Sequence, residues 1–300
     1  MIFSGSGVAI CTPFNCDNEF DPEVYARMIE FHAEKGTDAI ISCGTTGEAS
    51  TLSYDEHTEV VRTAVIAAKA AGEKRGRKLT VVAGSGGNDT TACINLGRRL
   101  VNAGADALMY VTPYYNKTSQ RGLIAHYSAL ESNLDLPIMV YNVPTRTTVN
   151  VQAKTMAVIA KLPGIAAVKE ASGDISQIAE VAERCEGLID LYSGNDDQIL
   201  PVLALGGVGV VSTVANIAPS RVRDIITSFA LGDVEAARKN QLALLPLIRL
   251  VFKDINPIPV KAGVRLLGFD AGECRLPLTN LDEGLEIELR DEMIRLGLIK

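Results

Sequence analysis

Eight short apolar runs alternate with helix-like segments along most of this chain, and this alternation limits the fold more than any other feature. The runs are rich in small or branched apolar residues, which is typical of strands covered on both faces. The predicted strands are Val8–Ile10, Ala39–Cys43, Leu79–Ala83, Ala107–Val111, Ile138–Val143, Ile165–Lys169, Ile189–Ser193 and Val208–Ser212.

Helical patterns fill the intervals, and the first of them opens at the start signal Asp21-Pro22. The predicted helices are Pro22–Lys35, Asp55–Ala71, Asp89–Ala103, Ser119–Ser132, Val151–Lys161, Ile175–Cys185, Asp196–Leu205 and Ser220–Leu231. Strict alternation implies a parallel sheet. Eight strands and eight helices in roughly 230 residues suit a closed (β/α)8 TIM barrel, an α/β fold, better than an open doubly wound sheet. A dinucleotide-binding fold is further disfavoured because no GxGxxG follows the first strand.

The alternation stops after about Leu231. Three more helices are expected at Asp233–Phe252, Pro257–Leu267 and Asn280–Leu298, with turn signals between them. We therefore predict a catalytic barrel over residues 1–231 and a small three-helix C-terminal appendage over residues 232–300.

Charge and cysteine usage exclude several classes of function. The net charge of -7 argues against a nucleic-acid surface, which needs a basic patch. No apolar run reaches the roughly 18 residues that a membrane span requires. The N-terminus lacks the pattern of a signal peptide. The six cysteines form no CxxC pair and no zinc-site spacing, so we expect a reduced cytoplasmic protein without a structural metal.

Lys169 is the strongest candidate for a reactive residue, because it ends the apolar run Ile165–Val168. Lysine rarely lies in such a run. A poorly hydrated site disfavours the ammonium form, lowers the pKa and makes a neutral amine available near neutral pH. A neutral amine attacks ketones and forms a Schiff base. The ordinary alternative is that this side chain leaves the strand end and reaches solvent.

Other reactive side chains follow the remaining strands, at the barrel end where such folds bind substrates. Thr45 and Thr46, between two glycines, offer hydroxyl and N–H groups to a small carboxylate. Tyr141 and Tyr115 can pass protons along a hydroxyl chain. Arg146 can hold a second carboxylate in a bidentate fork. Each feature has a structural explanation when taken singly: a plain turn, a core tyrosine, a surface ion pair. Their joint occurrence at one barrel end favours an active site.

Four motifs give the chain a resemblance to a known family. GTTGE at 44–48, PYYNK at 113–117, YNVPTRT at 141–147 and VKEASGD at 168–174 resemble the dihydrodipicolinate synthase family, within the superfamily of Schiff-base-forming pyruvate aldolases that includes N-acetylneuraminate lyase. The likeness runs from about Gly5 to Leu298 and includes NPIPVK at 256–261. The arginine of YNVPTRT is the feature most specific to the synthase.

The resemblance implies a role for each matching position. Lys169 would form the imine with pyruvate, while Tyr141, Thr45 and a Tyr115 from the neighbouring subunit would relay protons. The groups that would hold the substrates, pyruvate and L-aspartate 4-semialdehyde, are Thr46, Val211, Arg146 and Gly194. No metal or organic cofactor would be needed, because the imine itself accepts electrons. A homo-oligomer is implied, usually a tetramer and sometimes a dimer.

The resemblance also implies an effector site for free L-lysine. The matching positions are Ala49, Ser50, Tyr54, His57, Asn88 and Tyr114. Ala92 stands where lysine-sensitive members have a glutamate, and losing such a charge-assisted partner costs roughly 1.5–3 kcal/mol. Weak or absent feedback by lysine is the resulting hypothesis.

Two alternatives stay open at this stage. A sister aldolase acting on a sugar acid or another 2-keto acid would share Lys169 but would not need Arg146. A non-catalytic paralogue with a binding or structural role would be expected to lack Lys169 or Tyr141, and both are present.

Overall fold

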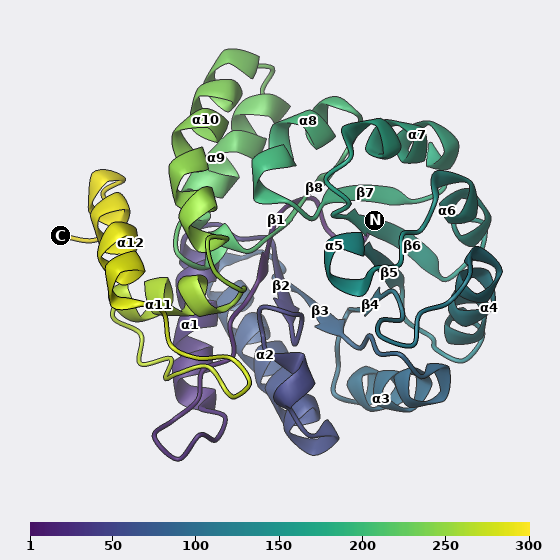
Figure 1. The fold of residues 1–300 in the computed structure, drawn as a ribbon, viewed down its shortest axis with the longest axis horizontal. Coiled ribbons are helices and arrows are strands. Elements are labelled where there is room, and N and C mark those ends of the chain that lie inside the picture. The colour runs from purple at the N-terminus through teal and green to yellow at the C-terminus, as the bar shows by residue number, and fades with distance from the viewer.

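Eight parallel strands form a closed barrel in the computed structural model, which describes residues 1–300 (Figure 1). Closure is direct, because Gly5 and Gly7 of the first strand pair with Gly209 and Val211 of the last. The (β/α)8 prediction is confirmed. The strands are β1 (Gly5–Ala9), β2 (Ala39–Ser42), β3 (Thr80–Gly84), β4 (Ala107–Val111), β5 (Ile138–Asn142), β6 (Ile165–Glu170), β7 (Asp190–Ser193) and β8 (Gly209–Ser212).

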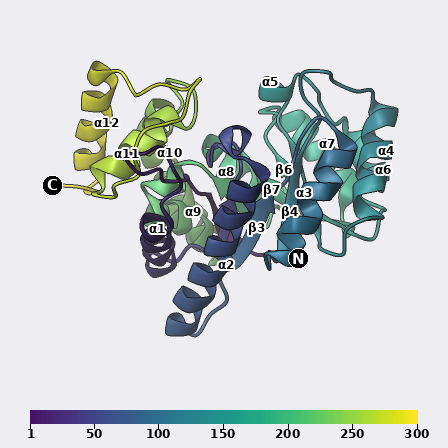
Figure 2. The same ribbon diagram turned by 90° about the horizontal axis from the view of Figure 1, so that it is seen from below.

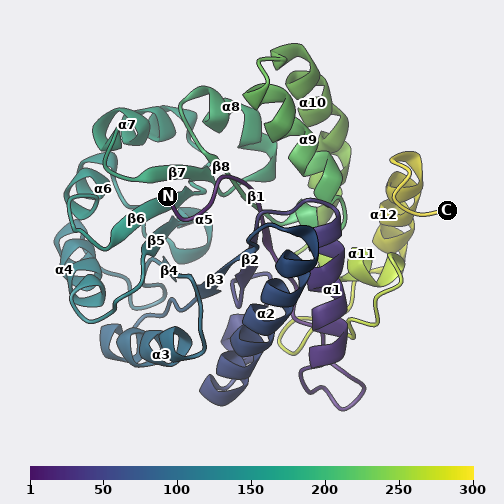
Figure 3. The same ribbon diagram turned by 180° about the vertical axis from the view of Figure 1, so that it is seen from behind.

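Helices surround the barrel as an outer ring, which is seen from both ends in Figures 1 and 3. Most begin at a side-chain cap of the kind that satisfies free N–H groups: Asp21, Asp89 and Asp174 each accept two backbone N–H groups. The ring helices are α1 (Pro22–Glu34), α2 (Tyr54–Arg75), α3 (Thr90–Asn102), α4 (Gln120–Glu131), α6 (Ala153–Ile159), α7 (Ile175–Cys185), α8 (Ile199–Ala204) and α9 (Pro219–Ala230).

Two parts of the ring differ from the prediction. A one-turn helix, α5 (Pro144–Thr147), was not expected, and it starts at a proline whose fixed φ suits a first helical position. The predicted helix Asp196–Leu205 is divided into a 3₁₀ turn, η2 (Asp196–Gln198), and α8. Two further 3₁₀ turns, η1 (Ala49–Thr51) and η3 (Val214–Asn216), lie after β2 and β8.

The three predicted C-terminal helices are present as α10 (Val234–Val251), α11 (Ile258–Leu266) and α12 (Glu283–Arg295). They stand together at one side of the barrel, and the chain ends beyond α12 (Figure 2). Their apolar faces join one large buried cluster with the outer faces of the strands, because Leu289 and Met293 of α12 belong to the same cluster as Val8 of β1. The appendage is thus packed on the barrel and shares its core.

Side-chain alternation along β5 and β6 decides what faces the barrel lumen. Tyr141 belongs to the smaller buried cluster inside the barrel, whereas Val140 belongs to the outer cluster between strands and helices. On β6 the neighbours of Lys169 divide in the same way: Val168 faces outward, and Ala167 lies inside. A period of two therefore directs Tyr141 and Lys169 inward together.

An aromatic pair closes the barrel at the end where β1 begins. The Phe3 and Tyr192 rings lie 4.5 Å apart, and the Tyr192 hydroxyl accepts from the Phe3 N–H and donates to the Phe3 carbonyl. The terminal amine of Met1 lies 3.5 Å from the Asp190 carboxylate at the same end. Phe3 is thus held as a plug on the face opposite the carboxyl ends of the strands.

The chain has neither a membrane-spanning helix nor a cluster of metal-binding side chains. None of the helices is both long enough and apolar enough to cross a membrane. No group of three or more His, Cys, Asp or Glu side chains is placed to hold a metal ion.

Candidate active site

Lys169 and Tyr141 are adjacent at the carboxyl end of the barrel. They are register partners on neighbouring strands, and the Lys169 Nζ lies 4.0 Å from the centre of the Tyr141 ring. Strand β6 continues one residue past the predicted end, to Glu170. The Lys169 side chain does not reach bulk water, since the residue is only 5% exposed. The solvent-reaching alternative for this lysine is therefore wrong.

Burial changes the protonation of Lys169. Loss of hydration lowers the pKa of its amine to about 7, the Asp196 carboxylate opposes that shift, and the Arg146 guanidinium adds to it. A substantial fraction of the amine is thus neutral near pH 7, which nucleophilic attack on a carbonyl requires.

Burial has the opposite effect on the neighbouring phenol. It raises the pKa of Tyr141 to about 12, although Arg146 opposes the shift. Tyr141 therefore keeps its proton near neutral pH. A protonated phenol beside a neutral amine can donate to a departing oxygen and accept a proton back.

The threonine pair lies in a tight turn between β2 and η1. Cys43 and Glu48, at either end of this turn, have left-handed backbone conformations, with φ values of 54° and 53°. Thr46 is buried and its hydroxyl accepts a hydrogen bond of 2.9 Å from the Asn256 side chain. Thr45 is exposed in the single chain.

A cavity of about 160 Å³ joins most of the predicted substrate and catalytic residues. Six of them line it: Thr45, Thr46, Tyr141, Arg146, Lys169 and Gly194. Two others do not. Val211 is buried on β8 among the lumen side chains, and Tyr115 is 90% exposed with a left-handed φ of 65°. Within one chain, Tyr115 does not complete a hydroxyl chain with Thr45 and Tyr141.

A second cavity of about 380 Å³ lies next to the first and shares lining residues with it, including Thr45 and Tyr141. All six positions of the expected effector site line it, namely Ala49, Ser50, Tyr54, His57, Asn88 and Tyr114. His57 is buried, and its Nε2 lies 2.8 Å from the Gly84 carbonyl, to which it donates as the neutral ring. Burial also lowers the pKa of His57.

Acidic groups are scarce at this second cavity. Asp89 is its acidic lining residue, and one oxygen of that carboxylate already accepts from the N–H groups of Thr91 and Ala92. Ala92 also lines this cavity, and its methyl side chain carries no charge.

Sequence comparison assigns the family. The model of the dihydrodipicolinate synthetase family matches residues 2–294. The chain belongs to the dihydrodipicolinate synthetase family. Among its curated relatives, the 4-hydroxy-tetrahydrodipicolinate synthase of Caldicellulosiruptor saccharolyticus is 49% identical over 297 residues, which cover 99% of this chain and 98% of the relative.

Solved structures of the family agree with the fold. Dihydrodipicolinate synthase from Aquifex aeolicus has a TM-score of 0.93 and 39% identity, with 99% of each chain covered. The enzyme from Cyanidioschyzon merolae, solved with lysine bound, has a TM-score of 0.94 and 39% identity, again with 99% of each chain covered.

Two residues of this family member that sequence reasoning missed lie close to the predicted site. Asn256 lines the first cavity and bonds Thr46, although its sequence context indicated only a turn before Pro257. Asp196 is buried, and its carboxylate accepts from the Ser212 hydroxyl and from the N–H groups of Thr213 and Val214, at the end of β8. Only its place directly after a strand end hinted at a role.

Proposed function

We propose that this chain condenses pyruvate with L-aspartate 4-semialdehyde through a Schiff base on Lys169, as a 4-hydroxy-tetrahydrodipicolinate synthase, a lyase of lysine and diaminopimelate biosynthesis. The observation that carries the proposal is the buried Lys169 amine with a pKa of about 7, beside the Tyr141 ring in a cavity. The curated relative described above has the name 4-hydroxy-tetrahydrodipicolinate synthase.

In the first half of the reaction, the neutral Lys169 amine adds to the ketone carbon of pyruvate. Loss of water from the resulting carbinolamine forms the imine, and the leaving oxygen needs a proton that Tyr141 can supply because its phenol stays protonated. The pyruvate carboxylate would lie against the Thr45-Thr46 turn, which borders the same cavity. The protonated imine then withdraws electrons and makes the pyruvate methyl group acidic.

In the second half, the enamine carbon bonds to the aldehyde carbon of the semialdehyde and leaves a hydroxyl group there. The substrate amine next attacks the imine carbon and displaces Lys169, which closes the ring and frees the enzyme. Arg146 suits the semialdehyde carboxylate, because it is exposed at the cavity edge and presents a planar fork of donors. Gly194 would accept from the incoming substrate through its carbonyl.

A second subunit belongs to the same proposal. Tyr115 is a large side chain that is 90% exposed, and Tyr114 beside it is also exposed. Two adjacent exposed tyrosines are typical of a covered interface. We infer that Tyr115 completes the site of a neighbouring copy in a homo-oligomer, with a dimer as the minimum and a tetramer as the fuller assembly.

The proposal also covers the response to L-lysine, the division into domains and the cellular location. We infer that L-lysine binds the 380 Å³ cavity only weakly, because Ala92 offers it no charge. Division into a barrel of residues 1–231 and an appendage of residues 232–300 stays a prediction. A cytoplasmic location stays one too.

Reductive trapping tests the proposed chemistry directly. Pyruvate and borohydride should add one reduced pyruvate to the intact chain, and peptide mapping should place it on Lys169. Lys169→Ala should take up none, while Lys154→Ala, a change at a solvent-facing lysine on α6, should label normally. An adduct that persists in Lys169→Ala would refute the assignment. A separate assay of the untreated chain with pyruvate and aspartate semialdehyde, set beside one with N-acetylneuraminate, distinguishes the synthase from a sister aldolase.

A further inference from the structure

A buried ion pair connects the C-terminal helices to the turn that carries the two threonines. The Lys261 Nζ, on α11, donates to a Glu48 carboxylate oxygen at 2.7 Å, and both side chains are 0% exposed. The same ammonium donates to the Glu273 carbonyl at 2.8 Å. Glu48 is the last residue of the GTTGE motif, and neither it nor Lys261 borders the 160 Å³ cavity.

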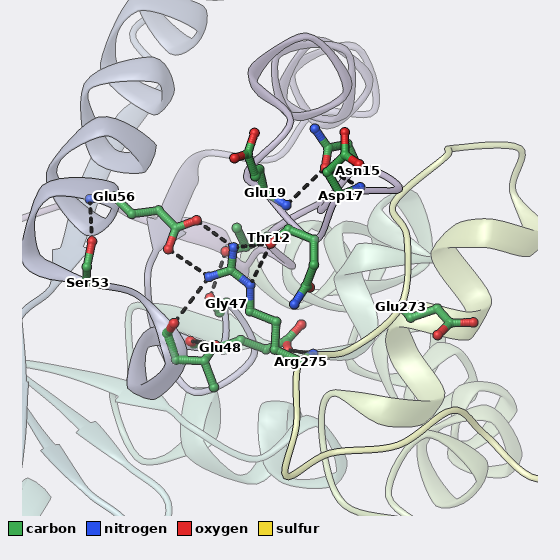
Figure 4. A network of polar contacts seen from close by, with 12 residues as sticks. Thr12, Asn15, Asp17, Glu19, Gly47, Glu48, Ser53, Glu56, Glu273 and Arg275 are labelled. Atoms are coloured by element: carbon green, nitrogen blue, oxygen red, sulfur yellow. Dashed lines mark hydrogen bonds and ion pairs between the residues drawn. The ribbon is translucent and has the colours of Figure 1, made fainter.

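The segment after α11 provides the second attachment of this carboxylate. The other Glu48 oxygen accepts the Arg275 backbone N–H at 2.8 Å. Figure 4 shows how the Arg275 guanidinium then reaches the Glu56 carboxylate of α2 through two hydrogen bonds. The Arg275 Cζ and the Lys261 Nζ lie 3.9 and 4.1 Å from the centre of the Phe14 ring. Both oxygens of Glu48 are therefore held by residues from one end of the chain.

The anchored residue is bonded directly to the predicted substrate-binding turn. The Glu48 N–H donates to the Thr45 carbonyl at 3.1 Å. The Gly47 carbonyl accepts from the Thr12 hydroxyl at 2.7 Å, an interaction also seen in Figure 4. A shift of the Glu48 side chain would therefore move the backbone of Thr45 and Thr46.

Stability alone does not account for such a pair. Taking two charges out of water is costly, and apolar residues of similar size often replace a buried ion pair without loss of stability. Glu48 also has a left-handed backbone, a conformation that glycine adopts more readily than glutamate. Directional hydrogen bonds fix a position more precisely than apolar contact does, and reacting groups need that precision.

We propose that Glu48 and Lys261 are positioning residues for Schiff-base formation: through them the C-terminal helices hold the Thr45-Thr46 turn at the distance from Lys169 that pyruvate requires. This inference rests on the proposed function. It gives the appendage a part in the chemistry although the appendage supplies neither the amine nor the phenol.

The test measures how the borohydride-trapped fraction depends on pyruvate concentration. The main variant is Glu48→Gln combined with Lys261→Met, which removes both charges and leaves neither alone in the core. Its half-saturating pyruvate concentration should rise about ten- to a hundredfold, the loss expected when a binding group moves by about 1 Å. Lys253→Met is the matched control, because Lys253 forms an exposed ion pair with Glu288 in the same C-terminal segment. That control should trap pyruvate as the unmodified chain does.

Thermal unfolding of each variant separates position from folding. The proposal is supported when the double variant unfolds within a few degrees of the unmodified chain and still binds pyruvate weakly. It is overturned when a folded double variant keeps the original pyruvate dependence. Should the double variant not fold, Glu48→Gln alone decides, because it keeps an acceptor for Lys261 and turns an NH2 group toward the Arg275 N–H. An unchanged pyruvate dependence of Glu48→Gln would also overturn the proposal. Absence of any adduct in the unmodified chain would instead contradict the proposed function.

Discussion

At the scale of single residues, Lys169 differs from an exposed lysine only in its surroundings, because the side chain itself is the same. Its amine is enclosed by the Tyr141 ring, and it is influenced by one buried carboxylate, Asp196, and one cation, Arg146. Desolvation is the largest of these effects and lowers the pKa to about 7. An exposed lysine keeps a pKa near 10.4 and is almost fully protonated at neutral pH.

The pH dependence of trapping follows from this pKa. At low pyruvate concentration the trapping rate should fall about tenfold per pH unit below pH 7 and level off above it, because only the neutral amine attacks. Asp196→Asn should move the midpoint to lower pH, since removing a nearby negative charge favours the neutral amine. A rate that keeps rising about tenfold per pH unit up to pH 9 would contradict a lowered pKa. The unfolded state binds more protons between the two pKa values, so this group makes the fold more stable as pH rises from about 7.

The uncharged side chain of Ala92 should limit how strongly L-lysine inhibits the enzyme. Ala92→Glu should increase sensitivity to L-lysine by about ten- to a hundredfold, because it adds a charge-assisted partner at the wall of the 380 Å³ cavity. Thr91→Glu is the control, since Thr91 is exposed and does not line that cavity. Inhibition curves measured on both variants and the unmodified chain decide the matter. Submillimolar inhibition of the unmodified chain would refute weak feedback.

At the scale of elements, the ends of β5 and β6 are fastened to each other behind the reacting side chains. Tyr141 and Lys169 face the lumen, while the next residues, Asn142 and Glu170, face outward and bond to each other. The Asn142 amide donates to both Glu170 oxygens, at 3.2 and 3.0 Å. One of these oxygens also accepts the Ser172 N–H at 2.8 Å. The spacing between the two strands is thus held from outside the barrel.

Asn142→Ala should therefore destabilise the fold by about 3 kcal/mol, because it leaves the buried Glu170 carboxylate without its amide partner. Urea unfolding at a fixed protein concentration measures the loss. Asn133→Ala, which removes an exposed side-chain bond to the Ala129 carbonyl, is the control and should cost well under 1 kcal/mol. Equal losses of unfolding free energy in the two variants would show that the Asn142–Glu170 hydrogen bonds stabilise the fold no more than an exposed one does.

Element prediction from sequence worked where one signal was sufficient. Ala107–Val111 and Ile175–Cys185 have the predicted bounds, because a short apolar run and an Asp174 cap each mark their ends locally. α5 was missed because four residues are too few to establish a helical period. The clustering of Thr45, Thr46, Tyr141, Arg146 and Lys169 followed from the barrel alone, since all five lie at or just after strand ends. Asn256 and Lys261 could not be found that way, because they come from the turn before α11 and from α11 itself, which the barrel topology does not place.

At the scale of the whole molecule, the exposed Tyr115 side chain leads us to predict a working unit of more than one chain. Light scattering should give a mass of at least two chains, and a monomer with full activity would contradict the shared site. Mixing Tyr115→Phe with Lys169→Ala gives a sharper test, because a hybrid dimer regains one complete site. With random exchange, activity should recover to about a quarter of the original value. No recovery after subunit exchange would mean that each chain completes its own site.

The Phe3 plug described above has a practical consequence for handling the protein. Met1 lies at the closed end of the barrel, so a peptide fused there extends away from the end that carries the predicted active site. The fusion would cost only the half-exposed contact between the terminal amine and Asp190, and exposed ion pairs of that kind are worth little. The chain can therefore be tethered to a sensor surface through its first residue while its open end stays free for ligand.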